Sequence, residues 1–158
     1  MFNEILRRNP DHASILQQPF YFDARGQQLP GTPRCQHVPI FNHYQGYLSV
    51  LYKRGYIHLA QRFEDVPRLS QEQVAALDLM DEVCDEFALE FEMRPGDILV
   101  ANNYDLLHAR SSFQNDGTPD RARHMLRLWL TIPNGRPLPP VFEHTREFHY
   151  SYMRRSAD

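Results

Sequence analysis

The chain has 158 residues, of which 42% are hydrophobic and 12% are aromatic, and its formal net charge is -3 at pH 7. This length predicts a single domain over residues 1–158, and the composition excludes an intrinsically disordered tail. The chain shows no block of like charges, no secretory signal, no membrane-spanning stretch and no disulfide framework, which argues against nucleic-acid and membrane partners and predicts a cytoplasmic protein.

The first predicted elements are a broken helix and a short strand. Residues 2–18 are predicted to be helical, with an interruption near Pro10 and with Asp11 as the candidate cap of the second part. An aromatic strand is predicted over residues 20–22. Residues 23–31 have the composition of a turn.

The next segment is predicted to be a strand pair followed by a loop. Residues 36–41 and 47–56 are predicted to pair around the turn between them. On this prediction Tyr52 and Arg54 lie in the second strand, where a structural role is favoured over a place in a cavity. Residues 62–69 are predicted to be a loop.

The best-marked helix begins at Ser70. Ser70 and Gln73 have the spacing of a capping box, in which each side chain satisfies a free amide at the start of the helix. Apolar residues then recur at helical spacing and predict one buried stripe: Val74, Leu77, Met80, Cys84 and Phe87. Cys84 is interpreted as a small core residue rather than as a reactive thiol.

The remaining elements are predicted to be strands. Residues 89–93 alternate apolar side chains with glutamates, and a turn at 94–97 joins them to a second strand at 98–102, so a hairpin is predicted. Residues 123–132 form the last predicted strand, and the tail from Pro133 has no periodicity. This order of elements predicts an all-β sandwich or jelly roll with helical decoration.

Two arginines share one face of the last predicted strand. Alternation places Arg123 and Arg127 beside Met125 and Trp129, opposite a face of leucines, with roughly 13 Å between the two arginine backbones. Arginine suits a carboxylate because its planar fork donates two parallel hydrogen bonds. The pattern therefore predicts two anion clamps, and the alternative is that both arginines are surface or salt-bridged residues.

A candidate metal ligand precedes the arginine strand. His108 follows an apolar strand and lies ahead of the two arginines. A lone histidine is more often a hydrogen-bonded structural residue than a ligand, and only this context distinguishes His108. The other seven histidines of the chain lack it: His12, His37, His43, His58, His124, His144 and His149.

These strings resemble a known family. GDILVANNYDLLHARSSF, followed by RARHMLRLWL, is similar to the C-terminal half of the taurine dioxygenase/TfdA family of iron(II), 2-oxoglutarate-dependent dioxygenases. Upstream, NEILRRNPD, PFYFDARG, LSVLYKRGYI and LSQEQVAALDLMDEV resemble the same family, so the resemblance extends to about Phe142. It implies a mainly β fold with flanking helices, as a partial double-stranded β-helix of the clavaminate synthase-like jelly-roll type.

The resemblance also implies roles for individual residues. In this family two histidines and one carboxylate hold the iron and leave positions for 2-oxoglutarate and oxygen. His108 matches the distal iron-binding histidine, and Arg123 matches the arginine that pairs with the far carboxylate of 2-oxoglutarate. Arg127 matches a position that contacts an anionic substrate group in some members, and Asn103 matches an asparagine that shapes the turn before the histidine. The implied reaction is hydroxylation of a small organic substrate, with an anionic group as a candidate feature.

The chain departs from the family in one respect. No histidine is followed two positions later by a carboxylate, so the family's His-x-Asp/Glu pair is expected upstream of the first residue given. On this interpretation the chain is truncated and lacks two of the three metal ligands, and one imidazole cannot hold iron(II) tightly.

Three hypotheses remain open. The first is the C-terminal part of an iron(II), 2-oxoglutarate-dependent dioxygenase. The second is a catalytically inactive fragment or binding module, which associates with itself through exposed strand edges. The third is a cupin-like binding protein without iron, which explains a jelly roll but not the arginine pair beside His108.

Overall fold

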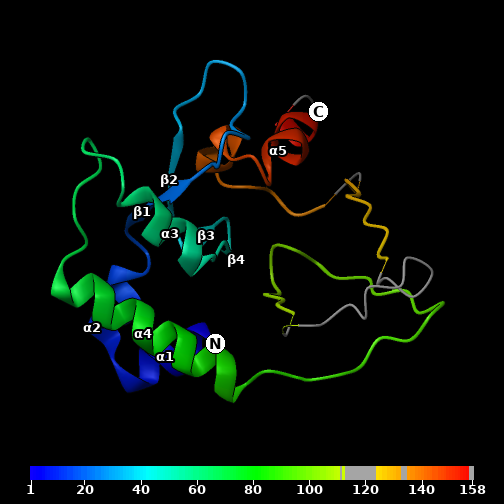
Figure 1. Ribbon diagram of the computed structural model, residues 1–158, viewed down its shortest axis with the longest axis horizontal. Coiled ribbons are helices and arrows are strands. Elements are labelled where there is room, and N and C mark those ends of the chain that lie inside the picture. Colours follow the sequence, from blue (N-terminus) through cyan, green and yellow to red (C-terminus); the bar gives the residue numbers. More distant parts are fainter. Residues whose placement is uncertain (111, 113–123, 133–134, 157–158) are drawn as a thin grey trace.

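The computed structural model describes residues 1–110, 112, 124–132 and 135–156. Helices α1, α2 and α4 lie together on one side of the body, and the β1–β2 hairpin, α3 and α5 lie beyond them (Figure 1). The elements in chain order are α1 (Phe2–Arg8), α2 (Pro10–Ile15), β1 (Pro19–Asp23), β2 (Cys35–Pro39), β3 (Phe41–Tyr44), β4 (Tyr47–Val50), α3 (Arg54–Ala60), α4 (Gln71–Glu86), the 3-10 helix η2 (Pro140–His144) and α5 (His149–Ser156).

The predicted break in the N-terminal helix is confirmed, but its cap is a different residue. Asn9 is extended and its side chain accepts a hydrogen bond from the backbone N–H of His12 at 3.1 Å. Pro10 occupies the first helical position, where its missing N–H costs nothing. The prediction of Asp11 as the cap was therefore wrong, because the residue before an N1 proline takes that position.

The four strands form two separate antiparallel hairpins. β1 pairs with β2, with Tyr21 opposite His37, and β3 pairs with β4, with Phe41 opposite Val50. The prediction that residues 36–41 pair with residues 47–56 was therefore wrong. Most of the first stretch belongs to β2, which pairs with β1 instead.

The turn between β3 and β4 and the end of β4 explain this difference. Gln45 and Gly46 both have positive φ values, of 46° and 81°, which a tight two-residue hairpin turn requires. The pairing across this turn therefore starts at Tyr44 and Tyr47. β4 ends at Val50, and Arg54 begins helix α3 rather than lying in a strand.

Helix α4 begins as predicted. The Gln73 backbone N–H donates to Ser70 Oγ at 3.1 Å, and the Ser70 N–H donates to Gln73 Oε1 at 3.0 Å, which confirms the capping box. Its buried face is shifted from the predicted stripe and consists of Ala76, Leu77, Met80 and Val83. Cys84 is half-buried against the core, and burial raises the pKa of its thiol to about 11, which agrees with an unreactive cysteine.

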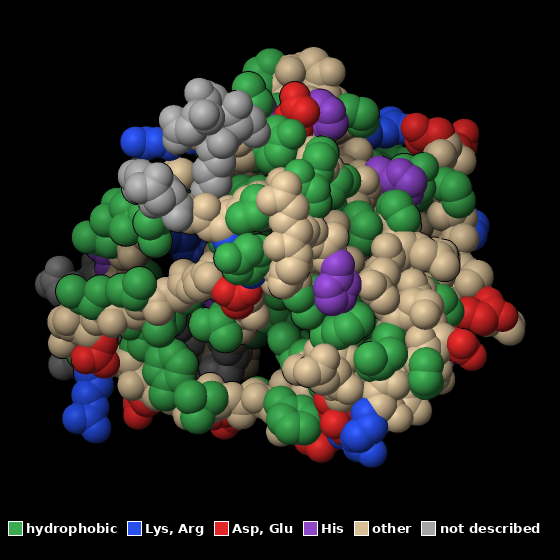
Figure 2. Space-filling model, turned by 180° about the vertical axis from the view of Figure 1, so that it is seen from behind, with side chains coloured by type: hydrophobic (Ala, Val, Ile, Leu, Met, Phe, Trp, Pro, Cys, Tyr) green, Lys and Arg blue, Asp and Glu red, His purple; other side chains and the backbone are tan. Residues whose placement is uncertain are grey.

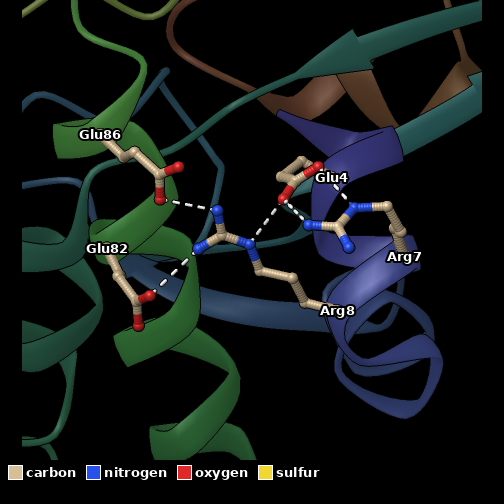
Figure 3. A network of polar contacts seen from close by, with 5 residues as sticks. All are labelled: Glu4, Arg7, Arg8, Glu82 and Glu86. Atoms are coloured by element: carbon tan, nitrogen blue, oxygen red, sulfur yellow. Dashed lines mark hydrogen bonds and ion pairs between the residues drawn. The ribbon is translucent and has the colours of Figure 1, made fainter.

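Arg8 ties α1 to α4 through three carboxylates. Its guanidinium lies 2.7 Å from Glu4 on its own helix and 3.0 and 2.6 Å from Glu82 and Glu86 on α4 (Figure 3). Hydrogen bonds from Arg7 and Arg8 lower the pKa of Glu4 to about 2. Because the two partners on α4, Glu82 and Glu86, are exposed, the network fixes how the two helices meet more than it adds to stability.

One hydrophobic core joins the two ends of the chain. It contains Phe20 from β1, Leu77 from α4, and Phe142 and Phe148 from the C-terminal tail. The centres of the Phe142 and Phe148 rings lie 4.4 Å apart. The tail, which has no periodicity in the sequence, therefore forms η2 and α5 and closes the core.

The segment after α4 contains no strand among its described residues. The turn at residues 94–97 is confirmed, since the Asp97 N–H donates to the Arg94 carbonyl at 3.0 Å. The flanking residues 89–93 and 98–102, and the described residues 124–132, belong to no helix and no sheet. They form a long path to one side of the helices (Figure 1).

The expectation of a mainly β fold is thus met only by the two hairpins in the described part of the chain. A lone strand leaves its backbone groups and one face without partners, so an alternating pattern alone does not produce a sheet. Among the described residues, no helix is long and apolar enough to cross a membrane.

Candidate functional site

The segment that carries His108 is held on strand β4. The backbone N–H of Val50 donates to the Tyr104 carbonyl at 2.9 Å, and the N–H of Leu106 donates to the Asn102 carbonyl at 3.0 Å. The side-chain oxygen of Asn102 accepts a hydrogen bond from the Tyr104 N–H at 3.1 Å. Leu107 packs against the core. These contacts fix the turn that immediately precedes His108.

Arg136 from the C-terminal tail clamps this turn. Its Nη1 donates to the Leu48 carbonyl at 3.0 Å and to Asp105 Oδ1 at 2.7 Å. The side chain is 11% exposed, and its guanidinium lies 5.2 Å from the centre of the Tyr104 ring. Arg136 therefore joins the tail, β4 and the turn at one point.

This clamp predicts a local effect of replacing Arg136. Arg136→Met removes the charged hydrogen bonds to Asp105 and Leu48, which typically stabilise by about 1.5–3 kcal/mol when a charged group takes part. We expect the backbone amides of residues 102–108 to exchange hydrogen at least about tenfold faster. Hydrogen-exchange mass spectrometry measures this rate.

Arg94→Met is the matched control, because Arg94 is exposed in the turn at residues 94–97. It should leave exchange at residues 102–108 unchanged. Equal exchange in wild type and Arg136→Met would show that Arg136 does not hold the turn.

The structure does not bring the predicted site residues together. His108 and Arg127 are both exposed, and Arg123 lies outside the described residues. In the described ranges, no group of three or more His, Cys, Asp and Glu side chains could hold a metal ion. Asn103 lies in the turn before His108, as predicted. The roles of His108, Arg123 and Arg127 remain predictions.

Sequence reasoning missed a polar cluster between α3 and α4. Arg54 lies 2.7 Å from Asp81 and 2.5 Å from Asp78, and Tyr52 donates a hydrogen bond to Asp81. Burial and the neighbouring Asp81 raise the pKa of the Tyr52 hydroxyl. The three-residue spacing of the two aspartates on one helix was the available signal. The two ion pairs of Arg54 join α3 to α4. The polar groups of the cluster therefore have their partners within the protein.

Two hollows open on the described surface, and His37 lines both of them. The first, of about 290 Å³, lies between the β1–β2 hairpin and the loop before α4 and includes Tyr21, Gln61 and Arg68 in its wall. The second, of about 190 Å³, lies between β2 and η2 and includes Cys35 and His144. Neither lining includes His108 or Arg127.

Comparison with known proteins gives a family and two relatives. Residues 1–129 match the family described as taurine catabolism dioxygenase TauD, TfdA family. FR-33289 synthase from Streptomyces rubellomurinus is 30% identical over 149 residues, which cover 88% of this chain and 42% of that protein. Taurine hydroxylase-like protein SAT17 from Stachybotrys chartarum is 26% identical over 159 residues, which cover 93% of this chain and 40% of that protein. The chain thus spans about two fifths of the length of each relative.

Proposed function

Because the chain belongs to the TauD/TfdA family of dioxygenases, we propose that it contributes part of the active site of an iron(II), 2-oxoglutarate-dependent dioxygenase. The observation that carries the proposal is the family match over residues 1–129, which includes His108, Arg123 and Arg127. The family has a double-stranded β-helix fold, and we assign residues 89–93, 98–102 and 124–132 to strands of that fold.

The metal ligands among the described residues limit the iron binding of this chain on its own. Members of the family typically use iron(II) and 2-oxoglutarate, and an iron site of this kind needs two histidines and one carboxylate. Since the described residues offer no set of three such ligands, they do not fit an iron ion by themselves. We assign to this chain one ligand, His108, and the two arginines.

Each of these residues has a physical role in the proposal. The bond from Val50 to Tyr104 and the clamp of Arg136 restrict where the His108 imidazole can lie. Arg123 pairs with a carboxylate of 2-oxoglutarate through two parallel hydrogen bonds. Arg127 pairs with an anionic group of a small organic substrate, which reacts with oxygen at the same site. The name of the SAT17 relative supports such a substrate, because taurine carries a sulfonate.

A chimera tests the two arginine roles separately. In it this chain replaces the matching 42% of FR-33289 synthase, whose remaining part is expected to supply the His-x-Asp pair. Arg123→Leu should raise the dissociation constant for 2-oxoglutarate about 10- to 100-fold, because a charged, bidentate pair is lost. Anaerobic titration of the iron-loaded chimera with 2-oxoglutarate measures this constant.

Arg127→Leu is the control, since it removes the same charge four residues further along the chain, on the same face of the predicted strand 123–132. It should leave the dissociation constant for 2-oxoglutarate within about twofold and weaken binding of an anionic substrate. If Arg123→Leu does not change 2-oxoglutarate binding, the assignment of Arg123 is wrong.

A further inference from the structure

The C-terminal helix α5 contacts both parts of the chain that carry the proposed site. The centre of the Phe148 ring, just before α5, lies 4.9 Å from the centre of the Tyr104 ring, in the turn that precedes His108. The hydroxyls of Ser151 in α5 and Thr131 lie 3.2 Å apart and share a hydrogen bond. The family match ends at residue 129, so it assigns no role to α5.

The packing of α5 explains why it presents Ser151 to the rest of the chain. Phe148 is buried in the core and Tyr152 packs against that core. The Tyr152 N–H donates to the Phe148 carbonyl at 2.9 Å, which begins the helix. Ser151 shares this inner face with Phe148, because residues three and four apart are neighbours on a helix. Tyr150, by contrast, is 74% exposed. The core contacts of α5 therefore hold the Ser151 hydroxyl in place.

Thr131 lies near the end of the arginine segment, residues 124–132. Alternation along the predicted strand 123–132 places Thr131 on the same face as Arg127 and Arg123. Of the described residues 124–132, Thr131 alone is not exposed. The others lie at the surface, and Figure 2 shows hydrophobic side chains on the side of the molecule where the chain after α4 runs. Thr131 is thus a point of attachment between the arginine segment and α5.

We propose that α5 is a positioning element of the site, which sets the place of the arginine segment relative to the turn before His108. Phe148 contacts the turn and Ser151 holds the segment, so one short helix spans both. The inference rests on the proposed function, because spacing matters only if His108 and the arginines act together. Groups of one site must be held within about 0.5 Å of their working positions by the residues behind them.

Fluorescence of the full chain tests the attachment without iron or 2-oxoglutarate. Trp129 is the single tryptophan of the chain and lies two residues before Thr131. We expect Ser151→Ala and Thr131→Val each to lower the fluorescence anisotropy of Trp129, because the released segment moves more freely on the nanosecond timescale. The double variant should lower it no further, since both changes remove the same bond. Ser151→Thr keeps a hydroxyl and should retain the wild-type anisotropy.

Binding to the chimera with FR-33289 synthase tests the effect on the site. Ser151→Ala should raise the dissociation constant for 2-oxoglutarate about three- to tenfold, as expected for one lost hydrogen bond. Iron affinity should stay within about twofold. The turn before His108 keeps its bonds to Val50 and Arg136, which explains this difference. General loosening of the fold would weaken both, so a change in 2-oxoglutarate binding alone indicates positioning.

Ser14→Ala is the control, because Ser14 is exposed in α2, which packs on α1 and α4. It removes the same hydroxyl and should change neither the anisotropy nor the two affinities. Anisotropy that responds to neither Ser151→Ala nor Thr131→Val would overturn the proposal. So would an unchanged 2-oxoglutarate constant in Ser151→Ala. A wild-type chimera that binds iron but no 2-oxoglutarate would instead show that the proposed function, and this inference with it, is wrong.

Discussion

Replacing Phe142 with alanine is expected to lower the free energy of unfolding by about 3–5 kcal/mol, the range for large aromatic side chains in a core. Phe142 is fully buried in η2, and the centre of its ring lies 4.4 Å from the centre of the Phe148 ring. The substitution opens a cavity where the C-terminal tail meets the helices and β-hairpins. Because a domain is typically stable by only 5–15 kcal/mol, the loss is a large part of the total.

Urea denaturation followed by far-ultraviolet circular dichroism measures this loss. Tyr150→Ala is the control, because Tyr150 is an aromatic residue of the same tail but is 74% exposed. It should change the free energy of unfolding by less than about 0.5 kcal/mol. If both variants are equally stable, the tail does not close the core as described.

Replacing His108 with alanine is expected to reduce the iron affinity of the chimera with FR-33289 synthase by at least about 100-fold. Outer partners of metal ligands already contribute 10- to 100-fold to affinity, and loss of a ligand removes a direct bond. Turnover of 2-oxoglutarate should fall to background for the same reason. Iron-binding titration and 2-oxoglutarate consumption measure the two effects.

His144→Ala is the matched control for this substitution, since His144 is exposed in η2. It should retain iron affinity within about twofold. Iron binding that is unaffected by His108→Ala would remove His108 from the site, although the family membership of the chain would stand.

The local signals in the sequence predicted the start of α4 and the turn at residues 94–97, because a capping box and an Arg-Pro-Gly-Asp turn are specified by adjacent residues. The partner of β2 was not predictable in this way. Residues 36–41 have the pattern of a strand, but the choice between β1 and β4 depends on tertiary packing. The helical tail was missed because short elements held by Phe142 and Phe148 leave no periodic signal.

The candidate site was predicted from the resemblance more than from the residues. Without the resemblance, a lone histidine such as His108 is more often a hydrogen-bonded structural residue than a ligand, and the structure places it on the surface. Its anchoring through Tyr104 and Arg136 could not be read from the sequence, because Arg136 lies in the tail, 31 residues beyond Asp105. Alternation in residues 89–93 and 124–132 predicts strands correctly only where neighbouring strands are present to pair with them.

The most direct test of the account is the absorption spectrum of the iron(II)-loaded chimera on adding 2-oxoglutarate without oxygen. If this chain supplies the distal ligand and the 2-oxoglutarate clamp, a metal-to-ligand charge-transfer band appears in the chimera and is lost in its His108→Ala variant. A folded chimera that binds iron and 2-oxoglutarate with the same band in the presence and absence of His108 would contradict the account.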